Sequence, residues 1–186
     1  PNTAFHVNRP LLPEDELAWD MQDHCAGRLD SAGYRQYEIS AWSKVDRQCR
    51  HNLNYWSYGD FVGIGAGAHG KITVPAENGV RRRIRTRHPK SWMLSAGTGE
   101  VLADNRRLSA DDRVFEFFLN QLRLREGVQI PQFEPRTGLP WSEVADRVTS
   151  LIDKGLLEEQ GSRLAPTETG WRFVNDMQSV FLPPGS

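Results

Sequence analysis

The sequence predicts an α/β fold, and three observations support this prediction. A helix and a strand follow one another within residues 13–43. A short helix and an apolar strand follow within residues 52–65, and a run of helices with two short strands occupies residues 109–186. Helices that alternate with apolar strands are typical of α/β domains.

The N-terminal segment predicts one helix and one strand. The helix is expected to begin at Pro13, because proline and the acidic residues after it suit the first turn, and to end at Gly33. Residues 34–43 predict a strand, because apolar residues alternate with polar ones such as Glu38 and Ser40. Along the helix, apolar residues fall at every fourth position on one face: Leu17, Met21, Cys25 and Leu29.

The middle segment predicts a short helix, a buried strand and a hairpin. Residues 52–58 can form the helix, and the apolar run 61–65 is of the buried type found in parallel sheets. Residues 72–74 and 81–86 are expected to pair as strands across a turn at residues 77–79.

Residues 109–186 predict a mainly helical, winged-helix-like domain, and residues 87–108 are expected to link it to the preceding part. Ser109 can cap its first helix, and a second helix is expected over residues 140–154. Two short strands and a last helix, capped by Thr167, complete the unit. The buried stripe of the first helix consists of Val114, Phe117, Phe118 and Leu122.

Composition narrows the class of protein. The formal net charge is −1, which gives no general attraction to nucleic acid or to anionic membranes, and no apolar run approaches the roughly 20 residues that span a bilayer. In the helix 140–154 acidic and basic residues nearly balance, so we expect no nucleic-acid partner. Two distant cysteines, Cys25 and Cys49, favour free thiols and a cytoplasmic location.

The segment from Cys49 to Trp56, CRHNLNYW, concentrates side chains that could bind a ligand: an imidazole, an amide and two aromatic rings. In a helix, His51 would lie one turn from Tyr55, and Asn52 one turn from Trp56. A neutral imidazole beside an aromatic ring suits an axial ligand for haem iron. Packing of these aromatic residues in a core explains the pattern as well. A zinc site with Cys49 would lack ligands, since structural zinc takes about four.

The following glycine-rich run predicts either a ligand-facing loop or a tight turn selected for packing. It includes the spacing GxGxxG, but residues 71–75 are extended and end in proline, so no dinucleotide-binding helix can follow. The residues expected to face a cofactor are Gly63, Gly65, Gly67, His69 and Gly70.

An arginine-rich run, RRRIRTR, covers residues 81–87. Alternation would place Arg81, Arg83, Arg85 and Arg87 on one face, where they could bind phosphate or carboxylate. A solvated strand that resists aggregation is the alternative interpretation.

Several motifs together resemble the HemW-type haem chaperones of the radical S-adenosylmethionine family, which in turn resemble the oxygen-independent coproporphyrinogen III oxidases, HemN. The motifs are YEISA at 37–41, CRHNLNYW at 49–56, GIGAGAHG at 63–70, RHP at 87–89, FEFF at 115–118 and EPRTGL at 134–139. The resemblance covers essentially the whole chain.

This resemblance implies that His51 binds haem within a motif of His51, Asn52, Tyr55 and Trp56. It implies that residues 1–86 are the C-terminal part of an incomplete TIM-type barrel, with Glu38 and Ser40 on a strand that faces the interior. Residues 109–186 would be the HemN C-terminal domain.

One departure from the family limits what this chain can do. The CxxxCxxC motif that holds a 4Fe-4S cluster is absent, and Cys25 and Cys49 cannot replace it. The cluster and S-adenosylmethionine are therefore expected only in a longer protein, of which this chain would be the C-terminal portion.

Two functions stay open for that protein. One is a haem chaperone that binds haem and transfers it to acceptor haemoproteins, including membrane-bound ones. The other is an oxidase that decarboxylates coproporphyrinogen III. Exposed strand edges also predict a homodimer for this chain.

Overall fold

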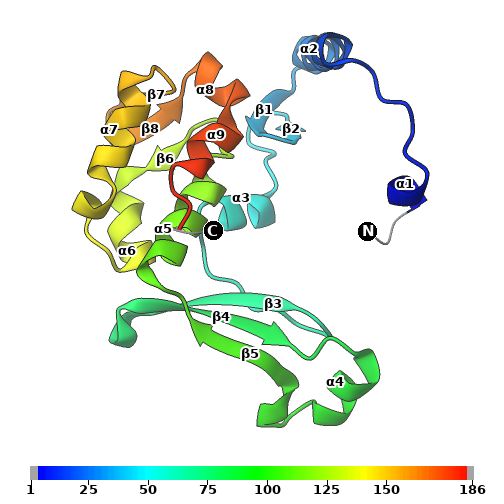
Figure 1. Ribbon diagram of the computed structural model, residues 1–186, viewed down its shortest axis with the longest axis vertical. Coiled ribbons are helices and arrows are strands. Elements are labelled where there is room, and N and C mark those ends of the chain that lie inside the picture. Colours follow the sequence, from blue (N-terminus) through cyan, green and yellow to red (C-terminus); the bar gives the residue numbers. More distant parts are fainter. Residues whose placement is uncertain (1–3, 184–186) are drawn as a thin grey trace. The chain divides into compact units, whose positions relative to one another are not determined.

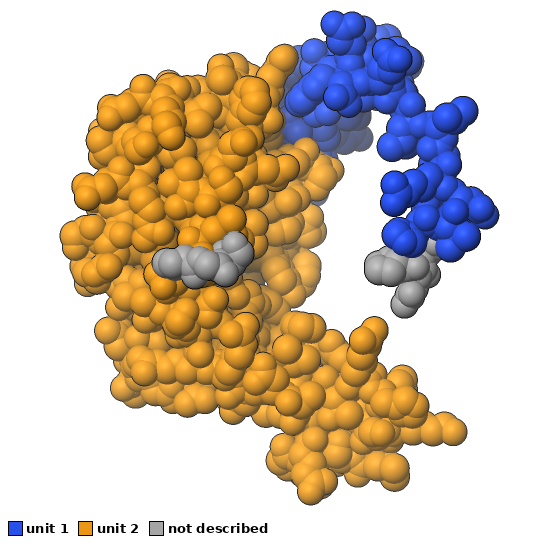
Figure 2. All heavy atoms as spheres, viewed as in Figure 1, with its two compact units in different colours: residues 1–36, 42–48 blue, residues 37–41, 49–186 orange. Residues whose placement is uncertain are grey.

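The computed structural model describes residues 4–183 and has a mixed α/β fold (Figure 1). It divides into two compact units, one of residues 1–36 and 42–48 and one of residues 37–41 and 49–186 (Figure 2). The outermost residues of the expected first and last domains, 1–3 and 184–186, lie outside the described residues.

The smaller unit contains the two N-terminal helices, α1 (Ala4–Val7) and α2 (Asp15–Ser31). The expected end of α2 is confirmed, since Gly33 adopts a left-handed conformation with φ of 79°. No residue of α2 is buried, and Leu17 of its apolar stripe is 54% exposed.

The strand expected over residues 34–43 is instead two strands, β1 (Arg35–Glu38) and β2 (Ala41–Ser43), which form a two-stranded sheet. Local hydrogen bonding explains the interruption. The Glu38 carboxylate accepts hydrogen bonds from the backbone N–H and the hydroxyl of Ser40, at 3.1 and 2.8 Å, and so closes a turn between the strands.

Helix α3 (Arg50–Trp56) confirms the short helix, but the buried strand expected at residues 61–65 is wrong. Only Phe61 forms a β-bridge, to Lys71, while Val62 and Ile64 are 67% and 85% exposed. The glycines are the physical cause. A Cβ on Gly63 would lie 2.2 Å from the carbonyl oxygen of His69, so the chain here folds back on itself.

The expected hairpin is confirmed and is part of a three-stranded antiparallel sheet (Figure 1). β3 (His69–Val74) and β4 (Gly79–Arg85) are joined by the 3₁₀ turn η1 (Pro75–Glu77) and by Asn78 in the left-handed region. The third strand, β5 (Leu102–Arg107), pairs with β4.

The segment expected to be a linker, 87–108, is therefore largely structured. Besides β5 it contains α4 (Pro89–Ser95) and the 3₁₀ turn η2 (Gly99–Val101). Both three-stranded sheets are antiparallel, and the two residues between β1 and β2 are too few for a parallel crossover. Among residues 4–183 the parallel strands of the expected barrel are therefore not found.

The C-terminal part is mainly helical, as expected. Ser109 caps α5 (Ala110–Gln121) in a capping box with Asp112. The helix expected over 140–154 is shorter, because a 3₁₀ turn precedes it. The remaining elements are β6 (Val128–Gln129), η3 (Ile130–Gln132), α6 (Phe133–Thr137), η4 (Trp141–Glu143), α7 (Ala145–Asp153), β7 (Leu157–Gln160), β8 (Arg163–Pro166), α8 (Glu168–Arg172) and α9 (Val174–Ser179).

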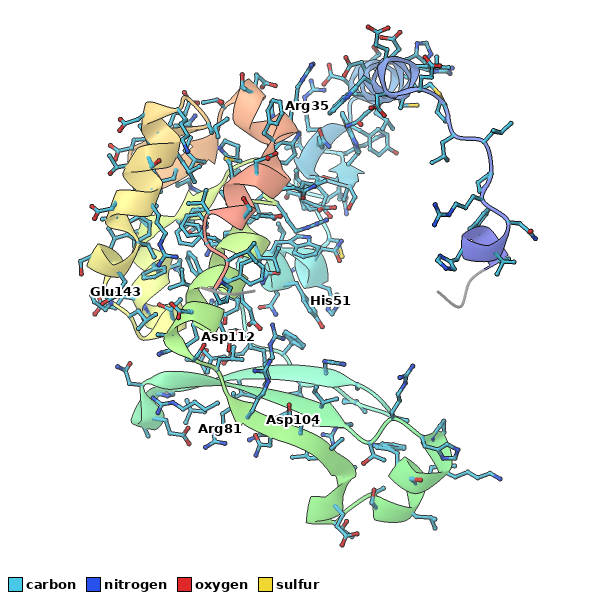
Figure 3. The ribbon with its side chains drawn as sticks, viewed as in Figure 1. Arg35, His51, Arg81, Asp104, Asp112 and Glu143 are labelled. Atoms are coloured by element: carbon cyan, nitrogen blue, oxygen red, sulfur yellow. The ribbon has the colours of Figure 1, made fainter. Side chains whose placement is uncertain are left out.

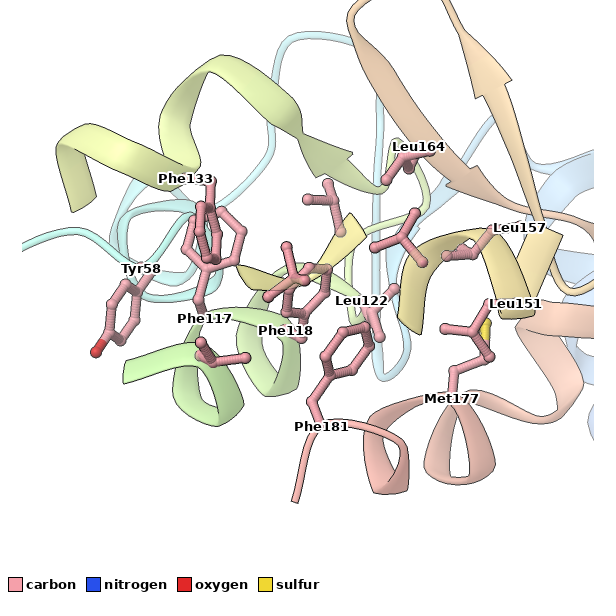
Figure 4. Close-up of a cluster of buried hydrophobic side chains, with 14 of the residues drawn as sticks. Tyr58, Phe117, Phe118, Leu122, Phe133, Leu151, Leu157, Leu164, Met177 and Phe181 are labelled. Atoms are coloured by element: carbon pink, nitrogen blue, oxygen red, sulfur yellow. The ribbon is translucent and has the colours of Figure 1, made fainter. Parts of the chain in front are cut away.

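Strands β6, β8 and β7 form a second three-stranded antiparallel sheet, in that order. The helices of this part bury one hydrophobic core (Figure 4). Its centre is aromatic: Phe118 and Phe181 stack with centroids 3.7 Å apart, and Phe117 meets Phe133 edge-on at 5.1 Å. Tyr58, which follows α3, packs into the same core.

Candidate functional site

Helix α3 presents His51 at the protein surface (Figure 3). The imidazole contacts Tyr55, with ring centroids 5.0 Å apart, and Tyr55 in turn stacks on Phe61 at 4.2 Å. Neither ring nitrogen of His51 is hydrogen-bonded within residues 4–183. An exposed imidazole with a free nitrogen, beside a row of aromatic rings, can ligate iron while a planar macrocycle lies against the rings.

Trp56 lies at the end of α3, and Arg123 covers it. The guanidinium carbon of Arg123 is 4.2 Å from the centre of the Trp56 ring, and the same group forms an ion pair of 3.2 Å with Glu38. Glu38 is only 2% exposed. A buried carboxylate therefore holds the cation that packs on the motif tryptophan. Asn52 is half-buried on the same helix.

The chain leaving α3 is tied to β3 by a buried ammonium group. Lys71 is 1% exposed, and its Nζ donates to the backbone carbonyl of Tyr58 at 2.9 Å and pairs with Asp60 at 3.0 Å. Its ammonium also lies 3.9 Å from the centre of the Tyr58 ring. Burial lowers the pKa of Lys71 below its ordinary value, although the Asp60 carboxylate opposes that shift.

A second ion pair joins the sheet to the C-terminal core. Arg82 binds Glu116 of α5 through two hydrogen bonds, of 3.0 and 2.8 Å, and the Tyr58 hydroxyl donates to the same carboxylate at 3.0 Å. Burial, followed by the charge of Glu116, raises the pKa of Tyr58 above its ordinary value. These groups, together with Tyr55 and Phe61, line a cavity of about 390 Å³.

The glycine loop lies beside a second cavity of about 210 Å³, which Gly63 and Gly70 line. Gly65 and Gly67 have φ of 101° and 69°, and a Cβ on Gly70 would lie 3.2 Å from the Gly63 nitrogen. Close backbone approach thus accounts for much of the glycine content. His69 is exposed at the start of β3.

The structure brings together some of the expected site residues. His51 contacts Tyr55 directly, and Glu38 and Ser40 both reach Arg123, the latter through a 3.4 Å hydrogen bond. Within residues 4–183, no group of three or more His, Cys, Asp and Glu side chains could hold a metal ion.

Sequence reasoning missed the supporting residues of the site. Arg123 is far in the sequence from Phe61 and Lys71, and both Lys71 and Arg123 carry charges that are ordinarily placed at the surface. The one local signal is Arg123 between two leucines, Leu122 and Leu124, just after α5.

Two comparisons relate the fold to known proteins. Residues 108–173 match the family described as the HemN C-terminal domain. The chain also superimposes on the solved structure of coproporphyrinogen III oxidase (HemN) from Escherichia coli, a radical SAM enzyme, with a TM-score of 0.62. That match covers 91% of this chain and 42% of the enzyme at 14% identity, and it shows a shared mixed α/β fold.

Sequence similarity confirms the resemblance to the HemW group. The chain is 41% identical to a protein named "Heme chaperone HemW" from Haemophilus influenzae, over 98% of this chain and 46% of that protein. A protein of the same name from E. coli is also 41% identical, with coverages of 98% and 47%. One from Mycobacterium tuberculosis is 35% identical, with coverages of 90% and 40%. The chain thus spans about half the length of the curated relatives it matches.

No helix among the described residues is long and apolar enough to cross a membrane.

Proposed function

We propose that this chain is the haem-binding part of a haem chaperone, in which His51 ligates haem iron and the haem then passes to an acceptor haemoprotein. The observation that carries the proposal is the exposed His51 imidazole, free of hydrogen bonds within the described residues, in ring contact with Tyr55. The names of the relatives support the same function.

Haem is the cargo here, and the residues present fit it. A surface imidazole offers an axial ligand, and the row of Tyr55 and Phe61 offers aromatic faces of the kind that stack on planar rings. Transfer to an acceptor requires the ligand to leave again. An exposed single histidine, rather than an enclosed pocket with two axial ligands, suits such release.

We further infer that the parent protein holds a 4Fe-4S cluster and S-adenosylmethionine in a part of the family sequence that this chain does not span. That part would also supply the parallel strands of a TIM-type barrel, with Gly63 and Gly70 on its cofactor side. The C-terminal elements would form the winged-helix-like domain. A cytoplasmic location, a homodimer and membrane-bound acceptors stay predictions.

The alternative function is the oxidative decarboxylation of coproporphyrinogen III, which the similarity to HemN favours. That chemistry depends on the cluster and not on an iron ligand at His51. The HNxxYW segment, and relatives named as chaperones over 98% of the chain, favour haem binding instead.

Haem titration of the chain, and of the full-length protein that contains it, tests the proposal. The unsubstituted protein should shift the Soret band of added haemin, and His51→Ala should abolish that shift. His88→Ala is a matched control, since His88 is also exposed and directly precedes a short helix, α4. An unchanged Soret shift in His51→Ala would refute the assignment. Formation of protoporphyrinogen by the reconstituted full-length protein, independent of His51, would favour the oxidase.

A further inference from the structure

The cavity of about 390 Å³ begins one helical turn from His51. Tyr55 lines it, and the same ring contacts the His51 imidazole with centroids 5.0 Å apart. Phe61, which stacks on Tyr55, lines it as well. The volume falls within the roughly 300–1,000 Å³ of sites that hold small molecules. A planar ligand whose iron is bound by His51 and that lies against Tyr55 therefore brings one of its edges to this cavity.

Helix α5 supplies a second apolar part of the lining. Phe115 and Leu119 are four residues apart, so they lie on one face of the helix, and both are half-buried. Phe117 and Phe118 of the same helix differ, since both are wholly buried in the core. Helix α5 thus presents to the cavity two apolar side chains that the core does not fully enclose.

The charged side chains that line the cavity, among the described residues, each have a partner of opposite charge. The pairs are Lys71–Asp60, Arg82–Glu116 and Asp112–Arg106, with 3.0, 2.8 and 3.7 Å between the charged atoms. A ligand carboxylate placed here would face the carboxylates of the lining and would compete with them for the two cations. The cavity therefore favours an uncharged edge of the ligand.

A haem macrocycle has such an edge, because its propionates lie on one side and the opposite side carries only methyl and vinyl groups. We propose that this vinyl-bearing edge enters the cavity between α5 and the β3–β4 hairpin, with the propionates directed away from it. The proposal rests on the haem-binding function proposed above and adds to it the orientation of the ligand. It also gives a role to Phe115, the first phenylalanine of the FEFF motif.

Filling the cavity is the most direct test. Leu119→Trp adds a bulky ring to the lining, introduces no charge and leaves His51 in place. Haemin binding, followed by Soret titration, should weaken about tenfold or more, because the vinyl edge then meets occupied space, while the Soret position of the bound form stays the same. Leu94→Trp is the matched control. It makes the same substitution at an exposed residue of α4 that does not line the cavity, so haemin affinity should stay unchanged.

Leu119→Ala distinguishes the two edges of the ligand. It removes part of the apolar lining and should weaken haemin binding about three- to tenfold. The same factor is expected for haemin dimethyl ester, which lacks the carboxylate charges, because the propionates stay outside the cavity. A smaller factor is expected for deuterohaemin, which lacks the vinyl groups. Each variant is compared with the unsubstituted protein on the same ligand in one detergent buffer, so that differences in ligand solubility cancel.

Failure of this proposal is distinguishable from failure of the proposed function. If Leu119→Trp binds haemin like the unsubstituted protein while His51→Ala loses the Soret shift, haem binding stands and the role of the cavity is refuted. Thermal unfolding shows whether each variant is folded, and Leu119→Ala decides the question if the tryptophan variant is not. An effect of Leu119→Ala that disappears with the dimethyl ester, or that is equal for haemin and deuterohaemin, also refutes the orientation. If the unsubstituted protein does not bind haemin, both proposals fall.

Discussion

Replacing Asp60 with asparagine tests the contact that fixes the exit of the motif helix to the central sheet. Asp60 pairs with the buried Lys71 ammonium at 3.0 Å and accepts two hydrogen bonds from Thr73, both of 2.8 Å, from its backbone N–H and its hydroxyl. Asparagine removes the charge opposite Lys71. It also places either its amide nitrogen against a donor or its single oxygen between competing donors, so at least one hydrogen bond is lost.

The expected loss in the free energy of unfolding follows from the burial of the ion pair. Breaking a buried ion pair by removing one partner costs about 3–5 kcal/mol, because the other charge stays uncompensated. The Asp60 side chain is 37% exposed, so solvent screening reduces this cost. We expect a loss of about 2–3 kcal/mol in the free energy of unfolding, and a fall in Tm of about 4–12 °C for a chain of this size.

The pH dependence gives a second measurement. Burial alone would raise the pKa of Asp60, but hydrogen bonds from Thr73 and Lys71 lower it below its ordinary value of 3.8. Its contribution is therefore present above pH 3.8 and is lost as pH falls through the lower folded-state pKa. Urea unfolding at a series of pH values should show a large difference in the free energy of unfolding between the unsubstituted protein and Asp60→Asn near neutral pH. This difference should become smaller in acid.

Asp111→Asn is the control for this experiment. Asp111 is exposed in the first turn of α5 and contributes only through the helix dipole, so its substitution should cost less than about 1 kcal/mol. If the free energy of unfolding of Asp60→Asn equals that of the unsubstituted protein at neutral pH, or differs from it by the same amount at every pH, the assignment of the ion pair is refuted.

Two further substitutions probe the core and the support of the motif. Phe181→Ala removes one ring of the stacked pair with Phe118 and should lower the free energy of unfolding by about 3–5 kcal/mol, measured by urea denaturation; a loss below about 1 kcal/mol would contradict the packing. Arg123→Gln leaves the carboxylate of Glu38 buried and unpaired and uncovers Trp56, so it should cost about 1–3 kcal/mol and shift tryptophan emission to longer wavelength; unchanged emission would contradict the contact.

Elements with strong local signals could be predicted from the sequence. The helix after Ser109 has a capping residue, two acids in its first turn and an apolar stripe, and the structure contains all three features in α5. The β3–β4 hairpin was likewise predictable from its turn, where Asn78 adopts φ of 45°. In both cases the determinants lie within a few residues of one another.

The errors concern segments whose conformation depends on partners outside the segment. Residues 61–65 are apolar enough for a buried strand, but backbone contact between Gly63 and His69 bends them into a loop. β5 is polar along most of its length, and only its ladder with β4, in which Arg83 pairs with Asn105, makes it a strand. Propensity within either segment does not contain that information.

In the candidate site, too, the local features could be predicted from the sequence and the non-local ones could not. The spacing of His51 and Tyr55 places them on one helix face, and that contact is observed. The contacts that hold the helix in place lie outside the motif: Arg123 reaches back 85 residues to Glu38, and Lys71 of β3 pairs with Asp60, which follows the helix. A motif can therefore be read from sequence when its chemistry is local, whereas the groups that orient it become visible only once the chain is folded. For this protein those groups are two ion pairs, each with one buried member, that lie against or next to the motif helix, which is why their substitution should disturb ligand binding and stability together.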